Sequence, residues 1–446
     1  MSIPQFTLKT FLKPKPSNVL VKQFCILLVL LAVVANANAE IIYVPDDHLK
    51  IQWAVDNASV TDTIIVRDGV YVENIKIYKT LTIKSENGSA NCVIKAKNPE
   101  NHVFVVTADH VSIVGFTVEG SKGMYLAGIY LENANYCHIS NNFLHKNNIG
   151  IYLDESSFNI IANNHCSNNE WWGIWLWDSK GNKIINNQFS NQDIGIYLSY
   201  SSGNIITNND CSFNDEDGIN IECSFKNTIT NNRCSLNGEA GINIEWSGGN
   251  SIVNNHCSDN RYGIYLYNSS DGSLWCSPRI KGKNAIVNNY CSGNYYGIYV
   301  YDSSYNNIYL NDFTDNSRNV YSYNSTNLWR TKSKITYIYK NKTYINYLGN
   351  YWDDYTGNDI NNDGIGENSY SIGLDKDDHP LMQPFEMYSL NLQVITSRTP
   401  ILTATPPITV TYTSPVQASS PKSTIPGFEV AIAITAVMAA LVLRRI

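Results

Sequence analysis

The feature that most constrains the fold is a repeat of 22 to 23 residues that fills the middle of the chain. Each unit opens on a motif like Gly-Ile-Tyr-Leu, and the opening glycines are Gly128, Gly150, Gly173, Gly195, Gly218, Gly241, Gly263 and Gly297. Apolar residues alternate within a unit, which is the period of a β-strand. Short strands at this spacing leave no room for crossover helices, so successive units stack about 4.8 Å apart. The repeat therefore predicts an all-β fold, a single-stranded right-handed parallel β-helix.

The composition supports strands over helices. The chain has 30 Tyr, is rich in Asn, and only 16% of its residues are charged. Asn favours turns and Tyr favours strands, so an all-helical enzyme is excluded. The formal net charge is −7. A nucleic-acid partner is not expected, because a phosphate-binding surface needs an excess of Lys and Arg.

Two residue ladders follow from the repeat. The second Asn of each Asn-Asn pair recurs at one corner, where Asn tolerates a left-handed backbone and stacked amides hydrogen-bond from coil to coil. Two residues later, one position accepts Leu, Phe or Cys, which predicts an interior apolar slot rather than a row of metal-binding thiolates or disulfides. Its members are Leu144, Cys166, Phe189, Cys211, Cys234, Cys257, Cys291 and Phe313. The roles of Cys92, Cys137, Cys223 and Cys276 are left unassigned.

The two ends differ in composition from the repeat. Lysines, an apolar run and a small-residue site before Glu40 predict a secretory signal peptide over residues 1–39. Thr, Ser and Pro dominate residues 391–425, which predicts an extended stalk, and an apolar run followed by Arg444 and Arg445 predicts a membrane segment within 426–446. Between these ends we expect an N-terminal cap and first coils (40–127, with a short capping helix at 51–58), the repeats (128–330, with an insertion at about 271–283) and a C-terminal cap (331–390).

These features resemble two known families. The coils, together with the segment YLGNYWDDYTGNDINNDGIGENSYSI, resemble the NosD-type, pectin-lyase-like β-helix proteins of the carbohydrate-binding and sugar-hydrolysis class. The stalk, Pro426-Gly427-Phe428, the apolar run and the final arginines resemble the PGF-CTERM sorting signal of archaeal surface proteins. The second resemblance implies an archaeosortase as processing enzyme and a protein held at the cell surface by its C-terminus. The NosD name implies copper delivery. The mature domain has no His or Met cluster, so a copper accessory protein is kept only as the last alternative function.

One acidic segment has the beginning of a calcium-binding pattern. Oxygen-bearing side chains alternate before a glycine and a position that offers a backbone carbonyl, in the order typical of a calcium loop. The expected ligands are Asp359, Asn361, Asp363, Ile365 and Glu367. The bidentate Glu of a complete loop is replaced by Tyr370, so an acidic turn without metal is the alternative.

Two outward rows of the repeat carry the candidate site. The first row has Tyr197, Asn220, Asn243 and Tyr265 in consecutive coils, and the second has Ser199, Glu222, Glu245 and Tyr267. Two adjacent coils thus replace aromatic residues with amides and carboxylates. Aromatic rings stack on the apolar faces of sugars, and a carboxylate pair among aromatics is typical of a glycan site. The predicted catalytic residues are Glu222, Glu245 and Asp217, and the predicted sugar-binding residues are Trp175, Trp177, Asn220, Asn243, Tyr197, Tyr265 and Tyr267.

Three functions remain open for this face. It can be a passive solvated ladder in an envelope protein, a carbohydrate-binding surface, or the site of a polysaccharide hydrolase, lyase or epimerase. The patch has no Lys or Arg to hold an acidic sugar. Composition and spacing do not decide between these readings, but a carbohydrate or cell-envelope glycan is the expected partner.

Overall fold

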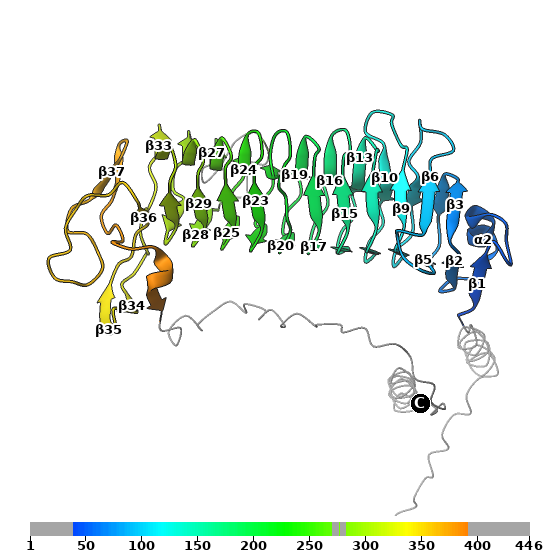
Figure 1. Cartoon of the computed structure of the whole chain (residues 1–446), viewed down its shortest axis with the longest axis horizontal. Coiled ribbons are helices and arrows are strands. Elements are labelled where there is room, and N and C mark those ends of the chain that lie inside the picture. The colour runs from blue at the N-terminus through cyan, green and yellow to red at the C-terminus, as the bar shows by residue number, and fades with distance from the viewer. Residues whose placement is uncertain (1–38, 270–275, 277–281, 391–446) are drawn as a thin grey trace, which may run out of the picture. The chain divides into compact units, whose positions relative to one another are not determined.

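The computed structural model describes residues 39–269, 276 and 282–390, and Figure 1 shows them as a row of stacked coils. The expected signal peptide, stalk and tail, and most of the insertion, lie outside the described residues. Among the helices in the described part of the chain, none is long and apolar enough to cross a membrane.

Three parallel sheets run along the stack. The first sheet has twelve strands: β1 (Ile41–Val44), β2 (Thr63–Val66), β5 (Thr82–Ser85), β8 (Ser112–Val114), β11 (His138–Ser140), β14 (Ile160–Ala162), β17 (Lys183–Ile185), β20 (Ile205–Thr207), β22 (Thr228–Thr230), β25 (Ser251–Val253), β28 (Ala285–Val287) and β31 (Asn307–Tyr309). The second sheet has eleven: β4 (Ile75–Ile77), β7 (Phe104–Val106), β10 (Ala127–Glu132), β13 (Ile149–Asp154), β16 (Trp172–Trp177), β19 (Ile194–Ser199), β21 (Ile219–Glu222), β24 (Ala240–Glu245), β27 (Tyr262–Tyr267), β30 (Tyr296–Tyr301) and β33 (Arg318–Tyr323).

The third sheet is split in two near the middle of the stack. One part contains β3 (Gly69–Val72), β6 (Cys92–Lys95), β9 (Thr117–Glu119), β12 (Phe143–His145), β15 (His165–Ser167) and β18 (Gln188–Ser190). The other contains β23 (Arg233–Ser235), β26 (His256–Ser258), β29 (Tyr290–Ser292), β32 (Asp312–Thr314) and β36 (Tyr351–Trp352). Asp210 bridges the two parts through isolated pairings with Gln188 and Arg233. The all-β parallel solenoid predicted from the repeat is confirmed.

The remaining elements lie at the two ends. Helix α2 (Ile51–Asn57) buries Ile51, Ala54 and Val55 beside β1, β2 and β4. The Glu73 carboxylate accepts the N–H groups of Ile51 and Gln52, which the first turn of a helix leaves without partners. The C-terminal elements are antiparallel β34 (Ile335–Tyr339), β35 (Lys342–Asn346) and β39 (Tyr388–Leu390), a hairpin of β37 (Tyr370–Ile372) and β38 (Asp375–Asp377), and a 3-10 helix at Phe385–Met387.

The interior is built from repeated apolar rows. Apolar residues of the second sheet, mostly Ile and Leu, point inward along the stack. The predicted cysteine slot is also interior: Cys166, Cys211, Cys234, Cys257 and Cys291 are fully buried and not disulfide-bonded. Burial raises the pKa of the Cys166 thiol, so the sulfur stays protonated. The prediction of an apolar slot filled by thiols is confirmed.

The asparagine corner differs in one respect from the prediction. The left-handed backbone belongs to the first Asn of each pair, for example Asn163 at φ 56° and Asn231 at φ 55°. The second Asn is buried and forms the ladder: the Asn209 N–H donates to Asn232 Oδ1 at 2.9 Å, and the Asn232 N–H donates to Asn255 Oδ1 at 3.0 Å. The two residues have different roles. The first Asn makes the bend, and the second Asn forms hydrogen bonds with the backbone groups that the bend exposes.

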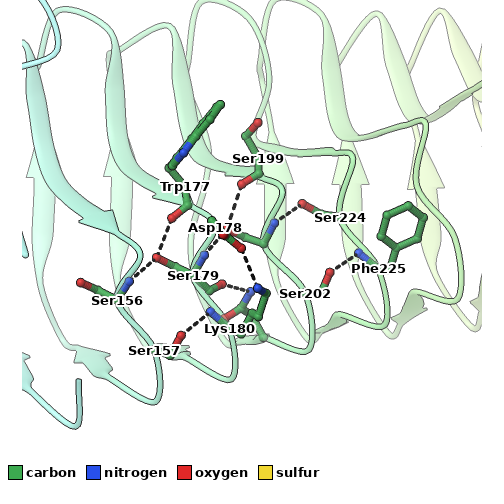
Figure 2. Close-up of polar contacts among 12 residues, drawn as sticks. Ser156, Ser157, Trp177, Asp178, Ser179, Lys180, Ser199, Ser202, Ser224 and Phe225 are labelled. Atoms are coloured by element: carbon green, nitrogen blue, oxygen red, sulfur yellow. Dashed lines mark hydrogen bonds and ion pairs between the residues drawn. The ribbon is translucent and has the colours of Figure 1, made fainter. Parts of the chain in front are cut away.

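A serine ladder fixes the corner that follows the second sheet, as Figure 2 shows. The Ser156 N–H donates to Ser179 Oγ at 2.9 Å, and the Ser179 N–H donates to Ser201 Oγ at 3.0 Å. Ser179 Oγ in turn donates to the Trp177 carbonyl at 2.8 Å. This corner therefore holds the end of each strand, and the second outward row, at a fixed height in the stack.

The glycine that opens each coil is required by close packing. A Cβ on Gly150 would lie 2.4 Å from the Gly173 carbonyl oxygen, and one on Gly241 would lie 2.7 Å from that of Gly263. Backbone atoms cannot yield at this distance, so the position excludes every side chain.

Two cysteines left unassigned by the sequence form a disulfide. Cys223, directly after β21, is bonded to Cys276, with a Cα–Cα distance of 5.2 Å. The bond ties the insertion to the corner of the coil that carries Glu222. The other two unassigned cysteines, Cys92 and Cys137, are buried in the core.

Candidate functional site

The two predicted outward rows lie on the outer face of the second sheet. Strand register places Tyr197, Asn220, Asn243 and Tyr265 one above another, and Ser199, Glu222, Glu245 and Tyr267 beside them. These positions lie between β19 and β27 in Figure 1. The predicted alignment is confirmed, and both carboxylates lie on the same face as the flanking aromatics.

A third row on this face was missed. It contains the residue before each coil glycine, which is apolar or aromatic in most coils: Ala127, Ile149, Trp172, Ile194, Ala240, Tyr262 and Tyr296. Asp217 occupies this row between Ile194 and Ala240. The sequence signal for this position of Asp217 is a lone carboxylate in an otherwise apolar row.

Asp217 is held by its neighbours and is only 5% exposed. It accepts hydrogen bonds from Asn220 Nδ2 at 2.9 Å, Asn243 Nδ2 at 3.0 Å and the Ala240 N–H at 2.9 Å. Burial raises its pKa to about 6, outweighing these three bonds, and the charge of Glu245 adds to the shift. The carboxyl group therefore titrates close to neutral pH.

Glu245, and not Glu222, lies with Asp217. Asn243 Nδ2 donates to Glu245 Oε1 at 3.0 Å as well as to Asp217, so one amide joins the two carboxylates. Burial raises the pKa of Glu245, and the nearby Glu222 raises it further. Glu222 instead accepts a hydrogen bond from the Tyr197 hydroxyl. The strand register still places Glu222 directly beside Glu245, and Asp217 joins Glu245 through the shared Asn243 amide.

A hollow of about 200 Å³ opens at this pair. Its wall contains the carboxylates of Glu216, Asp217, Glu239 and Glu245, the Asn243 amide, and the rings of Tyr262 and Tyr265. Glu222 is not part of this wall. The Oδ1 atoms of Asn220 and Asn243 are buried and have no hydrogen-bond partner among the residues that the structure describes. Buried polar atoms usually have partners, so this hollow is incomplete without a ligand or water.

The aromatic flank toward the N-terminus is mostly covered by its own rings. The Trp175 ring stacks on that of Tyr152, with 4.2 Å between the ring centroids, and it packs against Tyr125 and Trp172. These contacts leave Trp175 8% exposed. Its ring cannot offer a face to a sugar in this arrangement, contrary to the role we predicted. Trp177 is 38% exposed and remains accessible.

The other flank is a stack of tyrosines. The centroid of the Tyr265 ring lies 5.1 Å from that of Tyr262 and 5.3 Å from that of Tyr299. The ring centroids of Tyr267 and Tyr301 are 5.7 Å apart. Tyr265, Tyr267 and their neighbours are half-buried. They form an aromatic surface that continues directly from the hollow.

The predicted calcium ligands form a closed turn. Asp359 accepts the N–H groups of Asp363 and Gly364 at 3.0 and 2.9 Å, and Asn361 accepts that of Asp363 at 2.9 Å. Asp363 Oδ1 accepts the Ile365 N–H at 2.9 Å, while Glu367 is exposed. The turn gathers three oxygen-bearing side chains, the kind of ligand calcium prefers, and calcium here stays a prediction.

Comparison with known proteins identifies the family. The model of the family described as "Periplasmic copper-binding protein (NosD)" matches residues 55–210 and 172–357, about two thirds of the chain. The chain belongs to the NosD family. The residues do not fit the copper in that description: within 39–269, 276 and 282–390, no three His, Cys, Asp or Glu side chains come together as a metal site. We therefore derive no step through copper.

One curated protein is similar to part of the chain. A "Cell surface glycoprotein" of Methanothermus fervidus is 34% identical over 178 residues, which are 36% of this chain and 29% of that protein. The chain thus spans less than a third of the length of this curated relative.

Solved structures are more distant. The A-module of mannuronan C-5 epimerase AlgE6 from Azotobacter vinelandii has 15% identity and a TM-score of 0.48, covering 64% of this chain and 96% of the module. Dettilon tailspike protein has 14% identity and the same TM-score, covering 63% of this chain and 62% of its own.

Proposed function

We propose that this protein is an exported NosD-family β-solenoid that binds carbohydrate on the outer face of its second sheet. The observation that carries the proposal is the interruption of the aromatic rows at β21 and β24. There Asp217, Asn243 and Glu245 line a hollow that continues into the tyrosine stack. Sugars present hydroxyls at their edges and apolar C–H groups on their faces, and this surface offers a partner for each.

The fold itself does not require this interruption. Neighbouring coils carry Tyr or Trp at the first-row position and are equally well stacked. In the middle coils, the protein instead keeps a buried carboxyl group and two amide oxygens without partners, which costs stability. Such a cost is typical of a binding or catalytic site, because function compensates for it.

A glycan array probed with residues 40–390 tests the proposal, and a binding glycan is then titrated against variants. We expect Tyr265→Ala to weaken binding by about 1–3 kcal/mol, the scale of a lost aromatic contact. Tyr305→Ala is the control, since Tyr305 is 57% exposed at a different corner. Equal loss in both variants, or no glycan bound by the wild type, contradicts the proposal.

Hydrolysis is a second candidate, favoured by the Asp217–Glu245 pair. Both carboxylates accept from Asn243 Nδ2, so their oxygens lie within about 6 Å of each other, near the separation of about 5 Å in retaining glycosidases. Asp217, with a pKa of about 6, would donate its proton to the leaving glycosidic oxygen while Glu245 attacks the sugar carbon and the glycosidic bond breaks. Water, deprotonated by Asp217, would then attack the same carbon and release the sugar from Glu245.

Product release separates the enzyme from the binding protein. Reducing ends released by the wild type and lost in both Asp217→Asn and Glu245→Gln, with glycan binding retained, support hydrolysis. A glycan that binds and stays intact rules hydrolysis out. A lyase or epimerase is less well supported, because no cationic side chain belongs to the described wall of the hollow to hold an acidic sugar.

We also propose that the chain is displayed at the cell surface. The similarity to a cell surface glycoprotein supports export, and the signal-like start, the Thr/Ser/Pro stalk and the PGF-type tail of the sequence support C-terminal anchoring. In this proposal, helix α2 protects the N-terminal end of a right-handed solenoid. Mass spectrometry of the native protein tests the tail: loss of the residues after the stalk supports processing by an archaeosortase, and an intact C-terminus contradicts it.

A further inference from the structure

The hollow at Asp217 and Glu245 presents hydrogen-bond acceptors. Its four carboxyl groups accept hydrogen bonds when ionised. Asn243 has turned its Nδ2 onto Asp217 and Glu245, both at 3.0 Å, and this orientation leaves its Oδ1 without a partner. Asn243 is only 7% exposed, so bulk water does not freely satisfy that oxygen. A complementary ligand must therefore bring donors.

The charge around the hollow is strongly negative. Asp193, Asp215 and Glu216 lie on the turns beside it, and their mutual repulsion adds to burial in raising the pKa of Asp193 and Glu216. One nearby cation, Arg261, is already bound by both oxygens of Glu239 at 2.9 and 3.1 Å. A polyuronate would add further negative charge and be repelled, whereas a cationic group would relieve the repulsion.

Tyrosine rings complete the wall on one side. Tyr262 and Tyr265 border the hollow and stack on each other at 5.1 Å. A cation is attracted to the face of an aromatic ring, and the C–H face of a sugar packs on the same surface. The ring stack continues through Tyr299 to Tyr321 at 4.6 Å. A ligand longer than one sugar unit thus has a continuous surface beyond the hollow.

We propose that this hollow recognises the protonated amino group of an amino sugar within a glycan. An ammonium group carries three N–H donors, which match Asp217, Glu245 and the free Asn243 Oδ1. The sugar ring then packs on Tyr262 and Tyr265. This inference rests on the proposed carbohydrate binding and specifies its ligand as a hexosamine with a free amine.

Calorimetric titration with three tetrasaccharides tests the inference: a glucosamine tetramer, its fully N-acetylated counterpart and a galacturonate tetramer. At about pH 6.5 and 0.15 M salt, we expect the amino form to bind at least about tenfold more tightly than the acetylated form, because acetylation removes the charge and two donors. The galacturonate tetramer should bind most weakly.

Matched variants assign the effect to this hollow. Glu245→Gln keeps the shape and removes one charge, and it should reduce affinity for the amino tetramer about tenfold and affinity for the acetylated tetramer by a clearly smaller factor. Asp217→Asn should act in the same direction, with melting curves to confirm that it folds. Glu132→Gln is the control, since Glu132 is an exposed carboxylate of the same row on β10, five strands away.

The outcomes separate this inference from the proposed function. Equal affinity for amino and acetylated forms, or no effect of Glu245→Gln, overturns the amino-sugar inference and leaves carbohydrate binding in place. Binding of spermine as tight as that of the amino tetramer shows a site for a bare cation and overturns both. Equal loss in Glu132→Gln and Glu245→Gln shows a diffuse charge effect and overturns the inference.

Discussion

The inner and outer faces of the second sheet differ in how their residue types change from coil to coil. On the inner face, β21 and β24 carry Ile219, Ile221, Ile242 and Ile244, which are fully buried like their counterparts in every neighbouring coil. On the outer face of the same two strands, amides and carboxylates replace the aromatic residues found on either side. The backbone register does not change between the two patterns.

The difference shows which part of the sequence serves the fold. An inner residue must match the residues directly above and below it, because the interior is close-packed and any change in volume is felt. An outer residue is restrained less, by its neighbours on the same face. A local change on the outer face that brings buried carboxyl groups together is therefore the basis on which we propose a site there.

The largest expected difference between the two faces is tested by mutating adjacent residues of β21 that point to opposite faces. Ile221→Ala should lower the free energy of unfolding by about 2–5 kcal/mol, because it leaves a cavity in the stack. Glu222→Gln should change it by less than about 1 kcal/mol, because Gln can still accept the Tyr197 hydrogen bond. Urea unfolding measures both, and similar values for the two would remove the distinction.

The pH dependence of stability sharpens the comparison at Asp217. Its folded pKa of about 6 lies above the ordinary value near 3.9, so its favourable contribution is complete below about pH 4 and is lost as the pH rises through 6. The free energy of unfolding should fall by at most about 3 kcal/mol, because a pKa difference of about two units corresponds to about 1.36 kcal/mol per unit.

Asp217→Asn isolates this effect from that of other carboxyl groups. Asp312 and Asp377 also have pKa values raised to about 6 by burial, so they contribute to the loss of wild-type stability over the same window, as do other carboxyl groups with raised pKa values such as Glu245. Relative to the wild type, Asp217→Asn should therefore gain stability between pH 4 and pH 7. Parallel curves for the two proteins would show that Asp217 is not buried as an acid.

Thiol labelling tests the inner face without mutation. Cys166, Cys211, Cys234 and Cys257 are fully buried, so we expect a membrane-impermeant maleimide to leave them unmodified in the native protein and to label them after denaturation. Mass spectrometry of peptides identifies each site. Rapid labelling of native Cys234 would invert the assignment of inner and outer faces.

The smallest effect is expected at the C-terminal acidic turn. If calcium binds Asp359, Asn361 and Asp363, chelation should lower the melting temperature by a few degrees, and Asp359→Ala should abolish that response. The turn is already closed by backbone N–H groups, so the loss is expected to be modest. An unchanged melting temperature identifies an acidic turn without metal.

Much of the fold was predictable because the same short pattern of apolar residues recurs in every unit of the repeat. Eight glycines in phase fixed the coil length, the strand register and the inward position of the cysteines, and all three are confirmed. The corner asparagines were correctly placed, but the left-handed conformation was given to the wrong member of the pair. Periodicity locates a corner, whereas the backbone angles within it depend on hydrogen bonds to the next coil.

The site was predictable only in part. The rows of Glu222, Glu245 and the tyrosines followed from period two along the strand. The pairing of Asp217 with Glu245 and the covering of Trp175 did not, because they depend on how side chains from different rows turn toward one another. The Cys223–Cys276 bond could not be predicted from the sequence either, because a residue within an insertion has no equivalent in the other coils.

The central claim is that the interruption of the outer rows at β21 and β24 is a glycan site. A crystal structure of residues 40–390 soaked with the oligosaccharide that binds most tightly tests it directly. The account predicts density for a sugar ring on Tyr262 and Tyr265, with a donor of the sugar within hydrogen-bond distance of Asp217, Asn243 Oδ1 or Glu245. Density for the sugar on another face, with this hollow filled by water alone, would contradict it.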